Sequence, residues 1–148
     1  MTSYVVCTVA EMPPGTVRIV PVGNPQGIGV FNVAGKYYAL KNVCPHQGGP
    51  LCAGTVTGTT RAVMSDQEAP QLEWERDGEI VRCPWHKWEV DIATGHTVFT
   101  SRMRVGTYRV VVGKYDPARP TSADRVETYP VVEIYPVKVE NDLVILEL

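Results

Sequence analysis

The sequence predicts an all-β fold, and two features of its composition indicate this. Valine occurs 24 times, against six isoleucines and six leucines, and β-branched side chains pack best on a pleated sheet. Thirteen glycines and 12 prolines supply turns and interrupt long helices. With 148 residues, 44% of them hydrophobic, the chain has the size of one domain and can bury a core without disulfide bonds.

The first half of the chain is expected to contain short strands joined by turns. Residues 4–9 and 16–22 are β-rich and flank the turn signal Met12-Pro13-Pro14-Gly15. Residues 28–33 and 36–41 are expected to form a hairpin about Ala34-Gly35, which delivers the chain to Cys44. Between these strands and Cys83, the β pattern loosens over residues 51–79. We expect the middle of this stretch to be a long, partly ordered connection and residues 80–82 to form a strand.

The second half continues the pattern of short strands. Residues 88–92 are expected to form a strand ending at Ala93-Thr94-Gly95, followed by short strands near 97–100 and 108–112. The stretch 114–133 is a second elongated connection with no assigned role. Residues 131–139 and 143–148 are expected to pair as a terminal hairpin.

The charge of the chain argues against nucleic acid as a partner, because the formal net charge is −2. The N-terminal residues lack a basic region followed by a long apolar segment, so we expect no membrane span or secretory signal and a cytoplasmic protein. Structural disulfides are rare in that compartment. Residues 66–79 carry a net charge of −5 and residues 101–114 one of +4. This asymmetry either guides docking or belongs to ordinary solvated surface.

Two segments each combine a thiol with an imidazole: Cys44-Pro45-His46-Gln47-Gly48-Gly49-Pro50-Leu51 and Cys83-Pro84-Trp85-His86-Lys87-Trp88. They use two of the three histidines in the chain. A structural Zn²⁺ accepts two Cys and two His, but usually as one close Cys pair and one close His pair. In a [2Fe-2S] centre with mixed ligands, each loop can give its Cys to one iron and its His to the other. Gly48 and Gly49 are expected to let backbone N–H groups approach the cluster sulfurs.

These two boxes resemble the cluster-binding boxes of the Rieske [2Fe-2S] family, and the similarity continues through Trp88-Glu89-Val90-Asp91-Ile92 and Thr94-Gly95. The resemblance implies a small antiparallel Rieske-type β fold and one Rieske-type [2Fe-2S] cluster. It also implies that residues 1–148 are a single domain with a cluster-binding subdomain at about 42–95. The implied cluster ligands are Cys44, His46, Cys83 and His86.

Several positions depart from the family pattern or lie outside it. The acidic region around residues 66–79 resembles an insertion, and Lys87 stands where relatives commonly have Gly. High-potential respiratory Rieske proteins carry an additional disulfide-bonded cysteine in each box. Cys52 has no such companion in the second box, so the resemblance points to the low-potential, soluble ferredoxin branch. Cys7 and Cys52 are expected to be buried apolar residues.

Three further side chains near the boxes have expected roles. Trp88 is expected to pack against the core, whereas Trp85 either packs there or presents an apolar docking surface. His96 is expected to be a surface residue rather than a metal ligand.

The resemblance implies an electron carrier, because a Rieske centre changes by one electron and its imidazoles lie near the protein surface. Similar small proteins pass electrons from a flavin-dependent reductase to a terminal oxygenase. No catalytic residue is assigned, since a complete oxygenase also needs an iron site of two His and one carboxylate, and only His96 remains. Two alternatives stay open: a permanent small subunit of a larger oxidoreductase, such as a nitrite-reductase-like complex, and a structural zinc module.

Overall fold

The computed structural model describes residues 3–65, 68–100, 102–113 and 142–148. These residues form β-strands, turns and two single-turn 3-10 helices, without any α-helix, so the all-β prediction is confirmed. The elements are β1 (Ser3–Thr8), η1 (Val9–Glu11), β2 (Val17–Val20), β3 (Ile28–Val33), β4 (Lys36–Lys41), η2 (Leu51–Ala53), β5 (Thr55–Ser65), β6 (Glu68–Arg82), β7 (Glu89–Asp91), β8 (Thr107–Gly113) and β9 (Leu143–Glu147).

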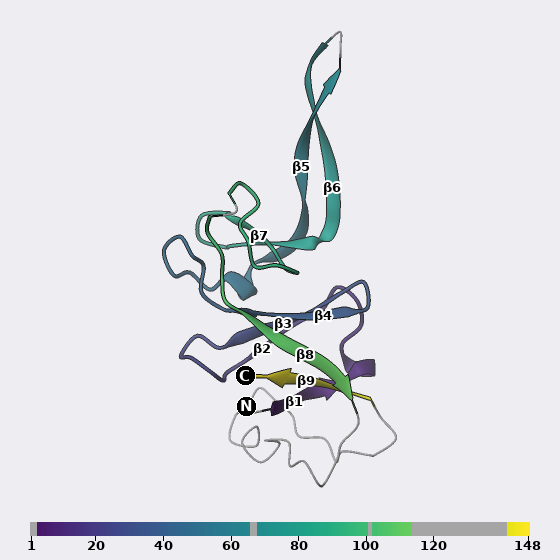
Figure 1. The fold of residues 1–148 in the computed structure, drawn as a ribbon, viewed down its shortest axis with the longest axis vertical. Helices are drawn as coiled ribbons and strands as arrows, with labels where there is room; N and C mark the ends of the chain where they lie inside the picture. Colours follow the sequence, from purple (N-terminus) through teal and green to yellow (C-terminus); the bar gives the residue numbers. More distant parts are fainter. Residues whose placement is uncertain (1–2, 66–67, 101, 114–141) are drawn as a thin grey trace.

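The strands form two antiparallel sheets (Figure 1). The larger sheet has the order β1-β9-β8-β4-β3-β2, and the smaller one has the order β5-β6-β7. The smaller sheet lies on the side of the larger one that faces away from the chain termini, and the β5–β6 hairpin projects beyond it (Figure 1). Within the described ranges, no helix has the length and apolarity needed to cross a membrane.

The hairpin β3–β4 confirms the prediction for residues 28–41. Its strands pair from Ile28↔Lys41 to Val33↔Lys36. The two turn residues between them, Ala34 and Gly35, both have positive φ, at 51° and 92°. Two-residue turns with positive φ at both positions match the right-handed twist of the flanking strands.

The end of the chain differs from the expected terminal hairpin. Strand β9 pairs with β1 from Ser3↔Glu147 to Thr8↔Leu143 and with β8 from Arg109↔Glu147 to Gly113↔Leu143. Both edges of β9 are therefore occupied, which leaves none for the segment that precedes it. The expected partner strand, residues 131–139, lies outside the described residues. So does the connection over residues 114–133.

Two clusters of buried side chains make up the core and meet at β3. Ile28 and Val30 belong to the first cluster, whereas Phe31 belongs to the second, because successive side chains of a strand point to opposite faces. The second cluster joins the two sheets. Its buried members are Phe31, Leu40, Cys44, Leu51, Cys52, Val81, Cys83, Val90, Ile92 and Val105.

The expectation of a loosely ordered connection over residues 51–79 is wrong. The structure has η2 there, followed by β5 and most of β6, which pair from Thr55↔Arg82 to Ser65↔Glu68. Most side chains of this hairpin beyond Gly58 are exposed or half-buried. Because neither face of the hairpin is buried, its sequence lacks the alternation of apolar and polar residues that indicates a half-buried strand.

The short strand expected near residues 97–100 is also wrong. The structure has two isolated bridges there, Val90↔Thr97 and His96↔Arg104, rather than a continuous strand. The strands expected near residues 80–82, 88–92 and 108–112 are present as the end of β6, β7 and β8.

Candidate metal centre

The first Cys/His loop is a tight backbone turn that begins at Cys44. The N–H group of Cys44 donates to the carbonyl oxygen of Gly49 at 2.8 Å, and the N–H group of Gly48 donates to the carbonyl oxygen of Cys44 at 2.9 Å. Gly48 has φ of +76°, a conformation in the left-handed region that glycine adopts at no steric cost.

The second loop repeats the same turn at the same spacing. The N–H group of Cys83 donates to the carbonyl oxygen of Trp88 at 2.8 Å, and that of Lys87 donates to the carbonyl oxygen of Cys83 at 2.9 Å. Lys87 has φ of +62° and occupies the position that Gly48 has in the first loop. This conformation explains why a glycine suits the position. It also shows that the two loops are structural counterparts, although their sequences share few residues.

Two close contacts hold the loops beside each other. A Cβ atom at Gly49 would lie 2.9 Å from Cδ2 of Trp85, so the absence of a side chain in the first loop makes room for an indole of the second. A Cβ atom at Gly54 would overlap the carbonyl oxygen of Arg82. The end of η2, which follows the first loop, therefore lies directly against the end of β6, which leads into the second.

The two cysteines lie on the inner side of the site. Cys44 and Cys83 are both buried, with exposed fractions of 3% and 1%, and belong to the core cluster that joins the two sheets. Burial raises the pKa of the Cys44 thiol, and the hydrogen bond and charge of the neighbouring Cys83 thiol raise it further. Backbone hydrogen bonds from His46 and Gln47 act in the opposite direction. Both backbone groups therefore approach the sulfur atom of Cys44 itself.

Gly48 and Gly49 also serve the packing of the two loops, while their expected role toward the cluster sulfurs stays a prediction. The N–H group of Gly48 is used inside the loop, as the donor to Cys44. Gly49 is needed for the close approach of Trp85.

The two histidines lie on the outer side of the site and face each other. The ring centroids of His46 and His86 are 4.6 Å apart, with an angle of 80° between the ring planes. His46 is half-buried, whereas His86 is exposed. Among the described residues, the buried Nδ1 atom of His46 has no hydrogen-bond partner. A buried ring nitrogen without a partner is a candidate metal-ligating atom, because neutral imidazole binds metals through such a nitrogen.

An aromatic chain runs from His46 to the surface, and sequence reasoning did not find it. The indole of Trp88 stacks on the His46 ring, with centroids 4.2 Å apart and an interplanar angle of 11°. The ring of Phe99 meets Trp88 edge-on at 4.7 Å. Phe99 is 61% exposed. Trp88 is half-buried and packs against the core cluster, as expected, but it also shields one face of His46.

The surface around the histidines is largely apolar. Trp85 is 58% exposed and lies over Gly49 of the first loop, so it is not a core residue and presents an apolar face to solvent. A docking role for that face stays a prediction. A shallow hollow of about 410 Å³ lies beside Trp88. It is lined by Lys87, Trp88, Glu89, Val98 and Phe99.

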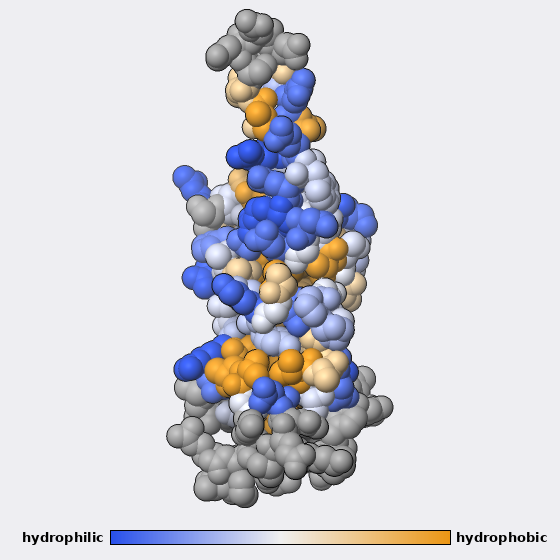
Figure 2. All heavy atoms as spheres, turned by 90° about the vertical axis from the view of Figure 1, so that its right-hand side faces the viewer, coloured by the Kyte–Doolittle hydropathy of each residue, from blue (hydrophilic) through white to orange (hydrophobic). Residues whose placement is uncertain are grey.

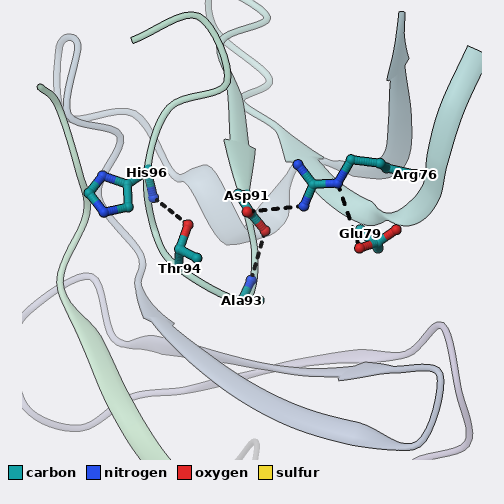
Figure 3. Close-up of polar contacts among 6 residues, drawn as sticks. All are labelled: Arg76, Glu79, Asp91, Ala93, Thr94 and His96. Carbon is teal, nitrogen blue, oxygen red and sulfur yellow. Dashed lines mark hydrogen bonds and ion pairs between the residues drawn. The ribbon is translucent and has the colours of Figure 1, made fainter. Parts of the chain in front are cut away.

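A network of charged groups supports the strand that follows the second loop. Nη2 of Arg76 lies 3.0 Å from Oδ2 of Asp91, and Nε of the same guanidinium lies 3.6 Å from Oε1 of Glu79 (Figure 3). The other carboxylate oxygen of Asp91 accepts a hydrogen bond from the N–H group of Ala93 at 3.1 Å. Sequence reasoning assigned no role to Arg76.

The remaining candidate residues are not among the four donors predicted from the sequence. Cys7 and Cys52 are buried, as expected, with exposed fractions of 1% and 3%. His96 is half-buried, and its backbone N–H group donates to Oγ1 of Thr94 at 3.2 Å (Figure 3).

Two pairs of donors meet at the site. The structure brings together two thiols on the inside and two imidazoles on the outside. Two thiolates on one iron and two imidazoles on the other are the donors of a Rieske-type [2Fe-2S] centre, so the residues present fit that group.

Comparison with known proteins also indicates a Rieske-type [2Fe-2S] centre. Residues 2–130 match the Rieske [2Fe-2S] domain family. Ferredoxin CarAc of Metapseudomonas resinovorans is 27% identical over 90 residues, which are 61% of this chain and 65% of that protein. The alignment therefore spans slightly less than two thirds of the curated relative.

Solved structures share the fold. The Sphingomonas yanoikuyae B1 ferredoxin is 26% identical with a TM-score of 0.51, and the match covers 74% of this chain and 89% of that one. A chain in a complex of reduced oxygenase and oxidised ferredoxin in carbazole 1,9a-dioxygenase is 24% identical with a TM-score of 0.54, covering 74% of this chain and 83% of that one.

Proposed function

Because the chain belongs to the Rieske [2Fe-2S] domain family, we propose that it is a ferredoxin-type carrier of single electrons. The family match and the ferredoxin relatives assign it one Rieske-type [2Fe-2S] cluster, which supplies reversible one-electron chemistry when bound. The observation that carries the proposal is the order of the donors: thiols inside, imidazoles outside, and one imidazole exposed. A cofactor held in this way has its histidine side close to a partner docked on the surface.

The proposed ligands are Cys44 and Cys83 for the inner iron and His46 and His86 for the outer iron. Three observations support this set: the contact between the thiols, the contact between the imidazole rings, and the Nδ1 atom of His46 without a partner in the described residues. Trp88 covers one face of His46 and excludes water from it, whereas His86 stays exposed.

We propose a terminal oxygenase as the electron acceptor and a flavin-dependent reductase as the donor. A ferredoxin chain of similar fold is described in complex with the oxygenase in carbazole 1,9a-dioxygenase, which supports the first partner. The alternative, a permanent small subunit of a larger oxidoreductase, predicts a stable complex when the protein is isolated from its own cells. The structural zinc module is set aside, because the family binds a [2Fe-2S] cluster.

The domain organisation and the cellular compartment of the protein are proposed together with this function. Residues 1–148 would form one domain with a cluster-binding subdomain at about 42–95, which the separate sheet β5-β6-β7 supports. The protein would work in the cytoplasm. In support, the two cysteines outside the proposed ligand set, Cys7 and Cys52, form no disulfide, and a reducing compartment keeps thiols in this state.

The test is spectroscopic. Protein expressed with iron should be red-brown, and after reduction with dithionite its electron paramagnetic resonance should show the low average g value of mixed Cys/His ligation. His86→Ala should remove or alter this signal, whereas His96→Ala, the matched control, should leave it unchanged. Identical spectra for both variants would defeat the ligand assignment. A colourless protein with stoichiometric zinc after iron–sulfur reconstitution would defeat the electron-carrier function.

A further inference from the structure

The outer part of the β5–β6 hairpin, here called the arm, consists of residues 59–65 and 68–75. It pairs only with itself, since β7 pairs with β6 at Ile80–Arg82 and no other described strand joins the sheet. At about 3.3 Å per residue, each strand of the arm extends roughly 20–25 Å. The arm projects from the end of the molecule that faces away from the termini, beyond β7 (Figure 1).

The direction of the arm is set by a wide bulge at its base. Between the pairs Thr57↔Ile80 and Thr59↔Glu75, β5 contributes only Gly58, whereas β6 contributes residues 76–79. Within that bulge Arg76 and Gly78 have φ of +57° and +82°. Bulges of this kind bend a strand and redirect the residues beyond them.

Side-chain contacts hold the bulge in place. The guanidinium of Arg76 bridges Asp91 of β7 and Glu79 of the bulge (Figure 3). A Cβ atom at Gly58 would lie 2.5 Å from the carbonyl oxygen of Glu75 and 2.9 Å from Cε2 of Trp74, so the indole lies across this glycine. The arm is therefore fixed relative to the strand that follows the second Cys/His loop.

One face of the arm is charged. Arg61 lies opposite Glu73, and its Nε atom is 3.4 Å from Oε2 of Glu75. Opposite residues of an antiparallel pair share a face, so these three side chains lie on the same side of the ribbon.

The other face is apolar and uncovered. Leu72 lies opposite Ala62, Trp74 lies opposite Thr60, and Met64 follows Ala62 on the same face of β5. The exposed fractions of Met64, Leu72 and Trp74 are 74%, 73% and 53%. Apolar side chains are visible along the arm in Figure 2. We call these three residues the apolar strip.

The area of the apolar strip argues against a stable dimer through the arms. A fully covered large side chain buries about 150–250 Å², and the three side chains of the strip are already covered in part. Covering their remaining exposed surface would therefore remove on the order of 400 Å² per copy. Two copies together would bury about 800 Å², whereas stable interfaces bury about 1,200–2,000 Å² and transient electron-transfer contacts bury less. The strip has the size of one element in a transient contact.

The charge around the strip indicates the chemistry of the partner. The arm itself carries one basic and three acidic residues, a net charge of −2, and the whole hairpin over residues 59–79 carries a net charge of −4. Complementary potentials accelerate encounter and fix orientation, so the partner surface should be basic at its margin and apolar at its centre.

We propose that the arm is a second docking element of this protein, beside the surface around the histidines, and that it takes a redox protein whose docking face has an apolar centre ringed by basic side chains. The proposal rests on the proposed electron-carrier function. The apolar strip covers the partner's apolar centre, and the net negative charge of the hairpin attracts the partner's basic margin through the thin ribbon.

Ferricytochrome c is a suitable probe, because its exposed haem edge is surrounded by lysines. The cluster-loaded protein is reduced with dithionite, freed of excess reductant and mixed with the probe. One electron leaves the protein, and one ferric haem becomes ferrous. The same experiment with ferricyanide, a small anion that needs no docking face, measures the electron-donating ability of the cluster alone.

The test variant is Met64→Gln/Leu72→Gln, which keeps the arm's charges and leaves Trp74 on Gly58. Its second-order rate constant with ferricytochrome c should fall about five- to tenfold, while its rate with ferricyanide stays unchanged. Val112→Gln is the matched control, because Val112 is 49% exposed on β8, away from the arm, and both rates should match the unsubstituted protein. All three proteins should react more slowly with ferricytochrome c at high salt.

Three other outcomes would each contradict either the role of the arm, the carrier function or the proposed partner. Equal rates with ferricytochrome c for the double variant and the unsubstituted protein would overturn the arm proposal and leave the carrier function intact. A protein that carries its cluster but reduces neither probe would overturn the carrier function itself. Sedimentation that shows a dimer, dissociated by Met64→Gln/Leu72→Gln, would assign the apolar strip to a second copy and also overturn the proposed partner.

Discussion

The close approach of Gly29 and Cys52 gives a quantitative test of how the first Cys/His loop is anchored. Gly29 lies in β3, and a Cβ atom there would overlap Sγ of Cys52 and lie 2.5 Å from its Cβ atom. Cys52 belongs to η2, directly after the first loop, and is 3% exposed. Gly29→Ala should therefore push η2 away from β3. Overpacking of a buried site typically costs about 1–3 kcal/mol.

The second variant removes the opposing side chain. Cys52→Gly deletes two buried heavy atoms, at about 0.8 kcal/mol each on the scale for a methylene group, and adds roughly 0.5–1 kcal/mol for the backbone freedom of glycine. For a chain of this length, 1 kcal/mol corresponds to a change in Tm of about 2–4 °C. Each single variant should thus lower Tm by roughly 3–10 °C.

The double variant Gly29→Ala/Cys52→Gly distinguishes packing from other causes. The new methyl group enters the space that the thiol vacates, so the double variant should lose no more than about the larger single loss. Recovery should be incomplete, because a Cβ atom at Gly29 also lies 3.2 Å from Cε2 of Phe31. Tm is followed by far-ultraviolet circular dichroism on the cluster-loaded protein, without oxygen and at one heating rate. If the two losses simply add, the contact between the residues does not anchor the loop and the reasoning is wrong.

Further expectations concern single residues. Lys87→Gly should raise Tm by about 1–3 °C, since relief of left-handed strain, about 1–2 kcal/mol, exceeds the backbone entropy of glycine, and Lys87→Ala should not raise it. Burial raises the pKa of Cys52 to about 12 and that of Cys7 to about 11, from ordinary values near 9. The folded state keeps these protons to higher pH than the unfolded state, so Tm should fall as pH rises from about 9 toward 12, and less so in Cys52→Ala. Glu89→Ala removes the acceptor 2.8 Å from Arg82 and should lower Tm by about 3–6 °C, whereas a change below 1 °C would show that the pair is not stabilising.

The candidate site could be predicted largely from sequence, because its chemistry restricts residue type and spacing. Few side chains bind iron, and two loops that each combine Cys with His have few other uses. What could not be predicted is how the loops are held. The left-handed conformation of Lys87 and the stacking of Trp88 on His46 depend on backbone angles and on contacts between separate loops. Neither leaves a periodic signal in the sequence.

The fold was predictable where strands have one buried face and turns have a defined chemistry. The hairpin β3–β4 satisfies both conditions, with buried side chains such as Val30 and Leu40 and the turn Ala34-Gly35. The arm satisfies neither along its outer part, since Leu72 and Trp74 on one face and Arg61 on the other are all exposed. Its pairing depends on the partner strand rather than on burial, so local sequence reasoning identified it as a connection.

The bulge at Arg76 explains how β6 can carry so long an arm and still lead into Cys83, one of the proposed cluster ligands. On the inner side of the bulge, Ile80 and Val81 are fully buried and pair with both neighbours, β5 and β7, up to the residue before Cys83. On the outer side, no described residue of the arm belongs to either core cluster. Since the entropy of closing a loop rises only slowly with its length, lengthening the hairpin beyond the bulge costs little stability. The register of the inner strands, and with it the position of Cys83, is set by the core, so the arm can vary in length and surface while the geometry of the metal centre stays constant.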